Sequence, residues 1–175
     1  VLSVPAKVHH VHWKSLQGDT AFLHVLEEMG CRSVEEEDGI KLFPPENAMH
    51  GGKFDLSAFS DQALTLAVIS CFADSPVTIT GIGHIRFQEC DRFQAIVSNL
   101  TRMGIECEKV DEETICIHPG KPKPCEIETF EDHRVAMSFA IPGLVTSGIV
   151  ILNPGCCRKT FADYFNVFSI IFNQK

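Results

Sequence analysis

Residues 91–118 read DRFQAIVSNLTRMGIECEKVDEETICIH, and their order of helix, stop and paired strands determines the fold. Apolar residues recur at spacings of three and four, which predicts an amphipathic helix over 91–103. Gly104 follows at the position where helices commonly end in a left-handed residue. Two strands are predicted over 106–110 and 114–118, on either side of an acidic turn.

The same order occurs once earlier in the chain. Laying Gly30 over Gly104 aligns residues 8–44 with residues 77–119. Each of these stretches begins with a predicted strand and a turn. The helix and the two closing strands of the earlier copy are predicted over 20–29, 32–35 and 40–43.

Two further apolar helices are predicted, over 61–72 and 132–144, and each leads into a β-branched strand. The first of them is apolar on nearly all sides, so we expect it to be buried. Pro142 should shorten or kink the second. Their strands are predicted over 77–79 and 149–151.

The chain therefore predicts an α/β fold of repeated βαβαββ units, given twice and then a third time incompletely. The expected units are approximately 1–60, 61–131 and 132–175, in a single lobe over 1–175. Related units that cannot bury their own apolar faces must pack together, and we expect a pseudo-threefold arrangement. The third unit ends after a strand, a cationic turn and a helix. The sequence thus indicates a piece of a larger protein, or a third unit completed by another segment.

Composition limits the class of protein. The chain has 175 residues, 45% hydrophobic and 22% charged, which suits one globular domain. Its net charge of -8 argues against nucleic acid as a partner, and no apolar stretch is long enough for a membrane span. Eight irregularly spaced cysteines without a Cys-x-x-Cys pair favour reduced thiols in the cytoplasm.

The histidines form no recognisable metal motif. On a predicted strand, His10 and His12 share one face while His9 points the other way. No carboxylate or thiol lies at ligand spacing from them in the sequence, so packed or solvated histidines are favoured over a metal site.

Two cationic turns indicate an anion site. Arg134 lies in FEDHRVAMSF at 130–139, and Lys159 lies in NPGCCRKTF at 153–161, each beside a predicted helix start. A cation at a helix start opposes the helix dipole, which suggests that a bound anion supplies negative charge. Three units around one axis would bring the turn before Arg92 to the same mouth. The alternative is unrelated surface cations with local carboxylate partners.

These motifs, with ECDR at 89–92 and SDQALT at 60–65, resemble the 5-enolpyruvylshikimate-3-phosphate synthase family. The resemblance covers essentially the whole chain but only the C-terminal part of such an enzyme. It implies one lobe of a two-lobed enolpyruvyl transferase, without the other lobe and without the N-terminal strands that would complete the third unit.

The resemblance also implies an activity. Members transfer the enolpyruvyl group of phosphoenolpyruvate to the 5-hydroxyl of shikimate 3-phosphate and release phosphate, without a metal or organic cofactor. Arg92 and Arg134 are then carboxylate or phosphate clamps, and Lys159 lies on the phosphate side. Asp61 matches the aspartate that contacts the hydroxyl, and Glu89 matches the proton-transfer glutamate.

Some of these residues have structural alternatives. Asp61 could cap its helix, and Glu89 could belong to a surface ion pair with a neighbouring arginine. Asp132 is expected to be a helix cap. His133 is expected to orient its neighbours or to hydrogen-bond the leaving phosphate.

Two positions depart from the family pattern. Gln88 stands where the family usually has Lys, and His84 stands where it usually has Asn; both family residues touch shikimate hydroxyls. Glutamine can still form hydrogen bonds, but it brings no charge to the acceptor. A divergent subgroup, a different acceptor or a degraded copy would each explain the change.

Three other functions stay open. A UDP-sugar enolpyruvyl transferase would share the fold and the donor, and a non-catalytic lobe could bind anions or assemble with a partner. A thiol or metal protein built on the cysteines and histidines is the third. We expect the isolated piece to be inactive without the missing lobe.

Overall fold

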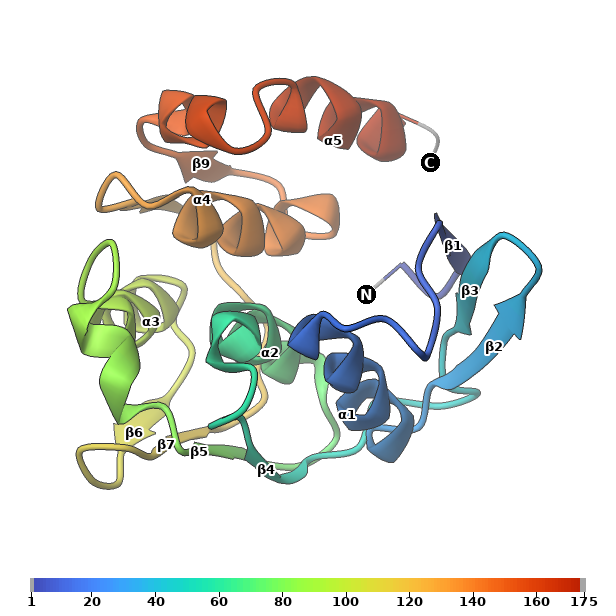
Figure 1. Ribbon diagram of the computed structural model, residues 1–175. Helices are drawn as coiled ribbons and strands as arrows, with labels where there is room; N and C mark the ends of the chain where they lie inside the picture. The colour runs from blue at the N-terminus through green and yellow to red at the C-terminus, as the bar shows by residue number, and fades with distance from the viewer. Residues whose placement is uncertain (1, 174–175) are drawn as a thin grey trace.

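The computed structural model of the chain describes residues 2–173, in which short strands and helices alternate (Figure 1). Three 3-10 turns adjoin the regions of interest: η2 (Ser60–Gln62), η4 (Gly83–Phe87) and η6 (Pro154–Lys159). The strands and α-helices are β1 (Ala6–His9), α1 (Phe22–Glu28), β2 (Arg32–Glu36), β3 (Gly39–Phe43), β4 (Gly52–Asp55), α2 (Ala63–Ile69), β5 (Val77–Thr80), α3 (Arg92–Arg102), β6 (Cys107–Lys109), β7 (Ile115–Ile117), β8 (Cys125–Ile127), α4 (His133–Ala140), β9 (Ile149–Ile151) and α5 (Tyr164–Asn173).

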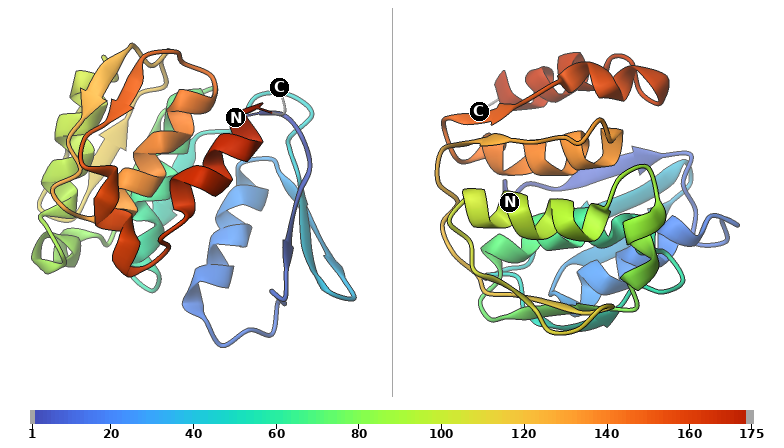
Figure 2. Two further views of the ribbon diagram at one scale, coloured as in Figure 1. Left: turned by 90° about the horizontal axis from the view of Figure 1, so that it is seen from above. Right: turned by 90° about the vertical axis from the view of Figure 1, so that its left-hand side faces the viewer.

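The strands form three separate sheets. β1, β3 and β2 pair antiparallel in that order, and β8 pairs with β9 in parallel. The four-stranded sheet has the order β4-β5-β7-β6, with a parallel β4–β5 pair followed by antiparallel pairs. Figures 1 and 2 show α1, α2 and α3 side by side with the sheets outside them, and α4 above α2. α2, α3 and α4 thus supply the helical part of the interior, whereas α5 lies on the outside of the fold.

Within residues 2–173, the repeated order occurs in full only once. β4, α2, β5, α3, β6 and β7 follow one another as βαβαββ, whereas the first group holds only β1, α1, β2 and β3. The expectation of two complete copies is therefore wrong. β4 precedes the expected boundary at residue 60 but pairs with β5, because its backbone extends the middle sheet. The third group holds β8, α4, β9 and α5; residues 174 and 175 of the expected unit lie outside the described residues.

The two aligned helices end in the same way, as the sequence predicts. Gly30 has φ 97° and Gly104 has φ 72°, so both lie in the left-handed region that glycine adopts without strain. The next backbone N–H, of Cys31 or Ile105, bonds back to a helix carbonyl at 2.9 Å in each copy. Equivalent stops therefore set the direction of the strand that follows each helix.

α2 lies at the centre of the core. Six of its seven residues are buried, which confirms the prediction from its apolar sequence. It is shorter than the expected helix over 61–72 because 3-10 turns replace its first and last residues. α4 is likewise shortened: Ile141–Leu144 is a 3-10 helix with Pro142 near its start.

The predicted strand face of the N-terminal histidines is wrong. The first strand ends at His9, and His10 adopts φ 62°, so no strand face joins His10 to His12. Carboxylates from distant residues nevertheless lie near these rings, since His9 Nδ1 is 2.8 Å from Asp38 and His12 Nδ1 is 3.1 Å from Glu35.

Lys159 does not lie at a helix start. It is the last residue of η6, and α5 begins only at Tyr164.

Elsewhere in the described chain, all eight cysteines are free thiols. No helix within residues 2–173 has the length and apolar character needed to cross a membrane.

Candidate active site

The candidate site lies where three helices of the interior meet. α4 packs against both α2 and α3, and η6 packs against α4. α3 begins with Arg92, and α4 begins with His133 and Arg134. The residues just before α2 and α3 supply carboxylates to this region, so segments distant in sequence contribute to one cluster of charges.

Arg92 and Asp132 form the buried part of this cluster, which we call the hub. Arg92 Nε donates to Asp132 Oδ2 at 2.7 Å, and its Nη2 donates to Oδ1 at 3.3 Å. The side chains are 4% and 0% exposed. Burial alone would raise the pKa of Asp132, but the hydrogen bonds and charge of Arg92 outweigh it and lower that pKa. The pair therefore stays ionised inside the fold.

The backbone before Asp132 is strained. Phe130 and Glu131 have φ 51° and 58°, although neither is glycine. Such conformations cost about 1–3 kcal/mol each and recur at functional sites. They lead Asp132 inward, where Oδ1 accepts from the backbone N–H of Arg134 at 2.8 Å. The expected role of Asp132 as a helix cap is confirmed, and its pairing with Arg92 adds to it.

Asp61 links the buried hub to the partly exposed Arg134. Its Oδ1 accepts from Arg92 Nη1 at 2.9 Å, and its Oδ2 lies 2.8 Å from Arg134 Nη2. Neither η2 nor α2 has a side-chain cap, so the capping alternative for Asp61 is wrong. Asp61 instead links two guanidinium groups.

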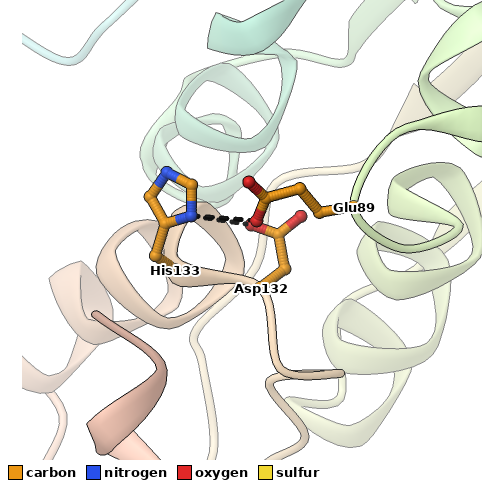
Figure 3. Close-up of side chains that lie close together, drawn as sticks. All are labelled: Glu89, Asp132 and His133. Atoms are coloured by element: carbon orange, nitrogen blue, oxygen red, sulfur yellow. Dashed lines mark hydrogen bonds and ion pairs between the residues drawn. The ribbon is translucent and has the colours of Figure 1, made fainter. Parts of the chain in front are cut away.

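Glu89 is the centre of a second set of contacts. Its Oε2 accepts from Lys159 Nζ at 2.9 Å. The same oxygen lies 3.0 Å from His133 Nδ1 (Figure 3). Burial raises the pKa of Glu89, but the Lys159 hydrogen bond and the charge of His133 together lower it. The same hydrogen bond raises the pKa of Lys159. Glu89 is thus a carboxylate and Lys159 an ammonium at neutral pH.

Gln88 and His84, which depart from the family pattern, lie around Asp61. Gln88 Oε1 accepts from Arg92 Nη1 at 2.7 Å, and its Nε2 donates to Asp61 Oδ1 at 3.3 Å. His84 Nε2 lies 2.7 Å from the hydroxyl of Ser60, one residue before Asp61. Gln88 therefore bridges two site residues, whereas His84 reaches only the neighbouring serine.

All eight sequence-predicted site residues lie in or beside this cluster. We call Glu89, Arg134 and Lys159 the rim, because their side chains are 37%, 33% and 53% exposed. An open cavity of about 520 Å³ is lined by Asp61, Gln88, Glu89, Arg92, His133 and Arg134.

The expectation of uncompensated cations is wrong. Arg92 and Arg134 pair with carboxylates brought by other elements, and Lys159 pairs with Glu89. Nor does Glu89 pair with a neighbouring arginine within the described residues; its partners come from α4 and η6. Two of the three carboxylates, Asp61 and Glu89, are themselves predicted site residues, so these cations are not unrelated surface charges.

Sequence reasoning missed two features of the cluster. The first is the Arg92–Asp132 pair, whose members are 40 residues apart with no shared motif. The second is Thr129, whose buried hydroxyl has no hydrogen-bond partner among the described residues. Thr129 lies in the loop just before α4, and the polar residues of that loop are the only sequence signal that points to it.

One part of the cluster has the spacing of a metal site. Donor atoms of Glu89, Asp132 and His133 lie within 4.8 Å of one another (Figure 3). However, Lys159 and Arg92 already neutralise the two carboxylates. A metal ion would have to displace both cations, so these residues do not fit a metal site.

Known proteins share this fold. The chain superposes on EPSP synthase from Acinetobacter baumannii with a TM-score of 0.82 at 24% identity, over 94% of this chain and 41% of that one. The enolpyruvyl transferase NikO from Streptomyces tendae gives 0.69 at 19% identity, over 93% and 37%. The fold is therefore one lobe of an enolpyruvyl transferase.

The sequence then gives the family. Residues 4–168 match the EPSP synthase (3-phosphoshikimate 1-carboxyvinyltransferase) family. A 3-phosphoshikimate 1-carboxyvinyltransferase from Nostoc punctiforme is 44% identical over 96% of this chain, and a chloroplastic one from Brassica napus is 37% identical over 90%. The chain belongs to the EPSP synthase family. It spans 39% and 32% of the lengths of these two relatives.

Proposed function

We propose that the chain supplies one side of an active site that transfers the enolpyruvyl group of phosphoenolpyruvate to the 5-hydroxyl of shikimate 3-phosphate. The observation that carries this proposal is the convergence of Arg134, Asp61 and Glu89 around one open cavity, with Lys159 paired to Glu89. Cations suit the carboxylate and phosphate of the donor, and carboxylates suit the proton transfers. Family membership favours this acceptor over a UDP-sugar.

Each residue has a role in the proposed addition. Asp61 accepts the proton of the attacking hydroxyl as its oxygen bonds to the central carbon of the enolpyruvyl group. A proton is delivered to the methylene carbon from the Glu89–Lys159–His133 set. At rest this proton is on Lys159, because the pKa of Lys159 is raised and that of Glu89 is lowered, so Glu89 relays it. The bond from the central carbon to phosphate then breaks, and one proton of the new methyl group returns to the Glu89 set, which restores the double bond. Asp61 gives up the hydroxyl proton to the departing phosphate.

Arg134 is the proposed donor clamp. Its side chain is one-third exposed, and its only ion-pair partner among the described residues is Asp61. Guanidinium N–H groups therefore remain for a carboxylate or phosphate of the substrate. Arg92 is less open, since Asp61, Gln88 and Asp132 already accept most of its N–H groups. In this proposal Arg92 both holds the site together and offers its remaining N–H.

The charge balance supports a site shared with other residues. Asp61, Glu89 and Asp132 offset the charges of Arg92, Arg134 and Lys159 within the cluster. Two phosphorylated substrates would need further cations. We therefore expect no turnover from the 175-residue chain alone. Its free thiols suit a reducing compartment, so a cytoplasmic location remains part of the proposal.

A chimera tests the function. The matching segment of the Nostoc punctiforme relative, which is 44% identical, is replaced by residues 4–168 of this chain. Release of phosphate from phosphoenolpyruvate is then measured with and without shikimate 3-phosphate. We expect turnover that requires both substrates. A folded chimera without turnover, or turnover by this chain alone, would contradict the proposal.

A further inference from the structure

A second cluster of potential ligands lies outside the candidate site, on the β6–β7 hairpin. The donor atoms of Glu106, Glu108 and His118 all lie within 4.8 Å of one another. β6 is an edge strand of the four-stranded sheet, next to β7 alone. These residues have no part in the proposed reaction.

The strand register puts the three side chains on one face. Cys107 pairs with Ile117, and the N–H of His118 donates to the carbonyl of Glu106 at 2.9 Å. Because strand side chains alternate, Glu106 and Glu108 lie on the same face as His118. Ile117 is fully buried on the opposite face. The cluster therefore occupies the outer face of the sheet, away from the helices.

Among the described residues, no lysine or arginine compensates the charge of this cluster. Nε2 of His118 is shielded from solvent and makes no hydrogen bond among the described residues, although Glu108 Oε1 is 3.4 Å away. Within residues 2–173, neither Glu106 nor Glu108 forms an ion pair with a lysine or arginine. Glu106 and Glu108 lie two residues apart on one face of the strand, where their negative charges repel each other. A cation between them would neutralise the carboxylates and also give the ring nitrogen a partner.

We propose that Glu106, Glu108 and His118 bind a divalent transition-metal cation of the Zn²⁺ type. Two carboxylates and an imidazole form a mixed oxygen and nitrogen donor set that suits this ion, with water as the fourth ligand. The bound ion joins the ends of two strands at the sheet edge. It therefore stabilises the hairpin without taking part in catalysis.

Calorimetric titration of the 175-residue chain with ZnCl₂ tests the site. His118→Ala removes the imidazole, and His50→Ala is the matched control, since His50 Nδ1 has one carboxylate neighbour, Asp74, at 2.8 Å. Both variants keep the eight thiols, so binding of zinc by cysteine is common to the comparison. Loss of a residue that only hydrogen-bonds to a metal ligand already costs about 10–100-fold in metal affinity. Loss of the ligand itself in His118→Ala should therefore weaken the binding of one equivalent of zinc by about 100-fold.

Thermal unfolding gives a second measurement. Zinc should raise the midpoint of the parent chain and of His50→Ala, but not that of His118→Ala. Glu106→Gln and Glu108→Gln, which preserve side-chain size, should each reduce the rise. An unchanged zinc affinity and midpoint shift in a folded His118→Ala variant would overturn the proposal.

Cobalt distinguishes these ligands from cysteine. Co²⁺ bound in the proposed site should give a spectrum without a thiolate charge-transfer band, and His118→Ala should remove that spectrum. A thiolate band on the equivalent that depends on His118 would overturn the assignment of the three ligands.

Discussion

The hub and the rim contain the same kinds of charge in opposite surroundings. The Arg92 and Asp132 side chains are 4% and 0% exposed, whereas those of Arg134 and Lys159 are 33% and 53% exposed. In the hub each charge is held by several protein partners. In the rim each cation meets one carboxylate and solvent. Burial thus separates charges that hold the helices together from charges that remain available to a ligand.

This difference predicts opposite responses to substitution. Removing one member of a buried ion pair leaves a charge without a partner, which typically costs about 3–5 kcal/mol. Exposed pairs contribute about 0–1 kcal/mol to stability. Hub variants should therefore lose stability, and rim variants should lose function while remaining folded.

The largest effect is expected for Asp132→Ala. It removes the partner of Arg92 and the cap of α4, so the free energy of unfolding should fall by about 3–5 kcal/mol in urea denaturation. Asp91→Ala is the matched control, because Asp91 caps α3 at 2.8 Å but is exposed. It should cost about 0.5–2 kcal/mol. Equal losses in the two variants would show that the hub has no special weight.

The same pair should make stability depend on pH. The folded-state pKa of Asp132 is lowered, so its contribution is complete above the unfolded value of about 3.9 and is lost as pH falls through the folded value. The stability difference between the parent and Asp132→Asn should therefore shrink below about pH 4. Exposed aspartates such as Asp38, whose pKa is about 2, titrate in both proteins and cancel. A difference that stays constant to pH 2 would refute the ionised pair.

The next largest effect is expected for Arg134→Ala. In the active chimera it should lower kcat/KM for phosphoenolpyruvate by the equivalent of about 2–4 kcal/mol, because one charge-assisted contact to the donor is lost. The urea midpoint should change little, since the Arg134–Asp61 pair is partly exposed. Loss of stability with normal kinetics would place Arg134 in the hub.

Gln88→Ala should have the smallest effect. Its amide bridges Arg92 and Asp61 through two neutral-to-charged hydrogen bonds at 2.7 and 3.3 Å. We expect kcat/KM for shikimate 3-phosphate to fall by the equivalent of about 1.5–3 kcal/mol at most, mainly through a higher KM. A change confined to the KM for phosphoenolpyruvate would contradict its assignment to the acceptor side.

The sequence predicts the helices and strands well because their signals are local. The glycine stops at Gly30 and Gly104 and the apolar helix α2 follow from spacing and composition. Resemblance to a family identified all the residues that line the cavity. The ion pairs could not be predicted, because they join helices distant in the chain and depend on their packing. The left-handed turn at Phe130 and Glu131 also lacked a local signal, since neither residue is glycine.

Kinetics of Lys159→Ala beside Arg158→Ala in the chimera test the central claim most directly. The two cations are adjacent in η6, but only Lys159 reaches Glu89, at 2.9 Å. If the rim serves a phosphorylated substrate, Lys159→Ala should lower kcat by about 100-fold, and Arg158→Ala should leave it unchanged. Near-normal turnover by both variants would contradict the assignment of the rim to the reaction.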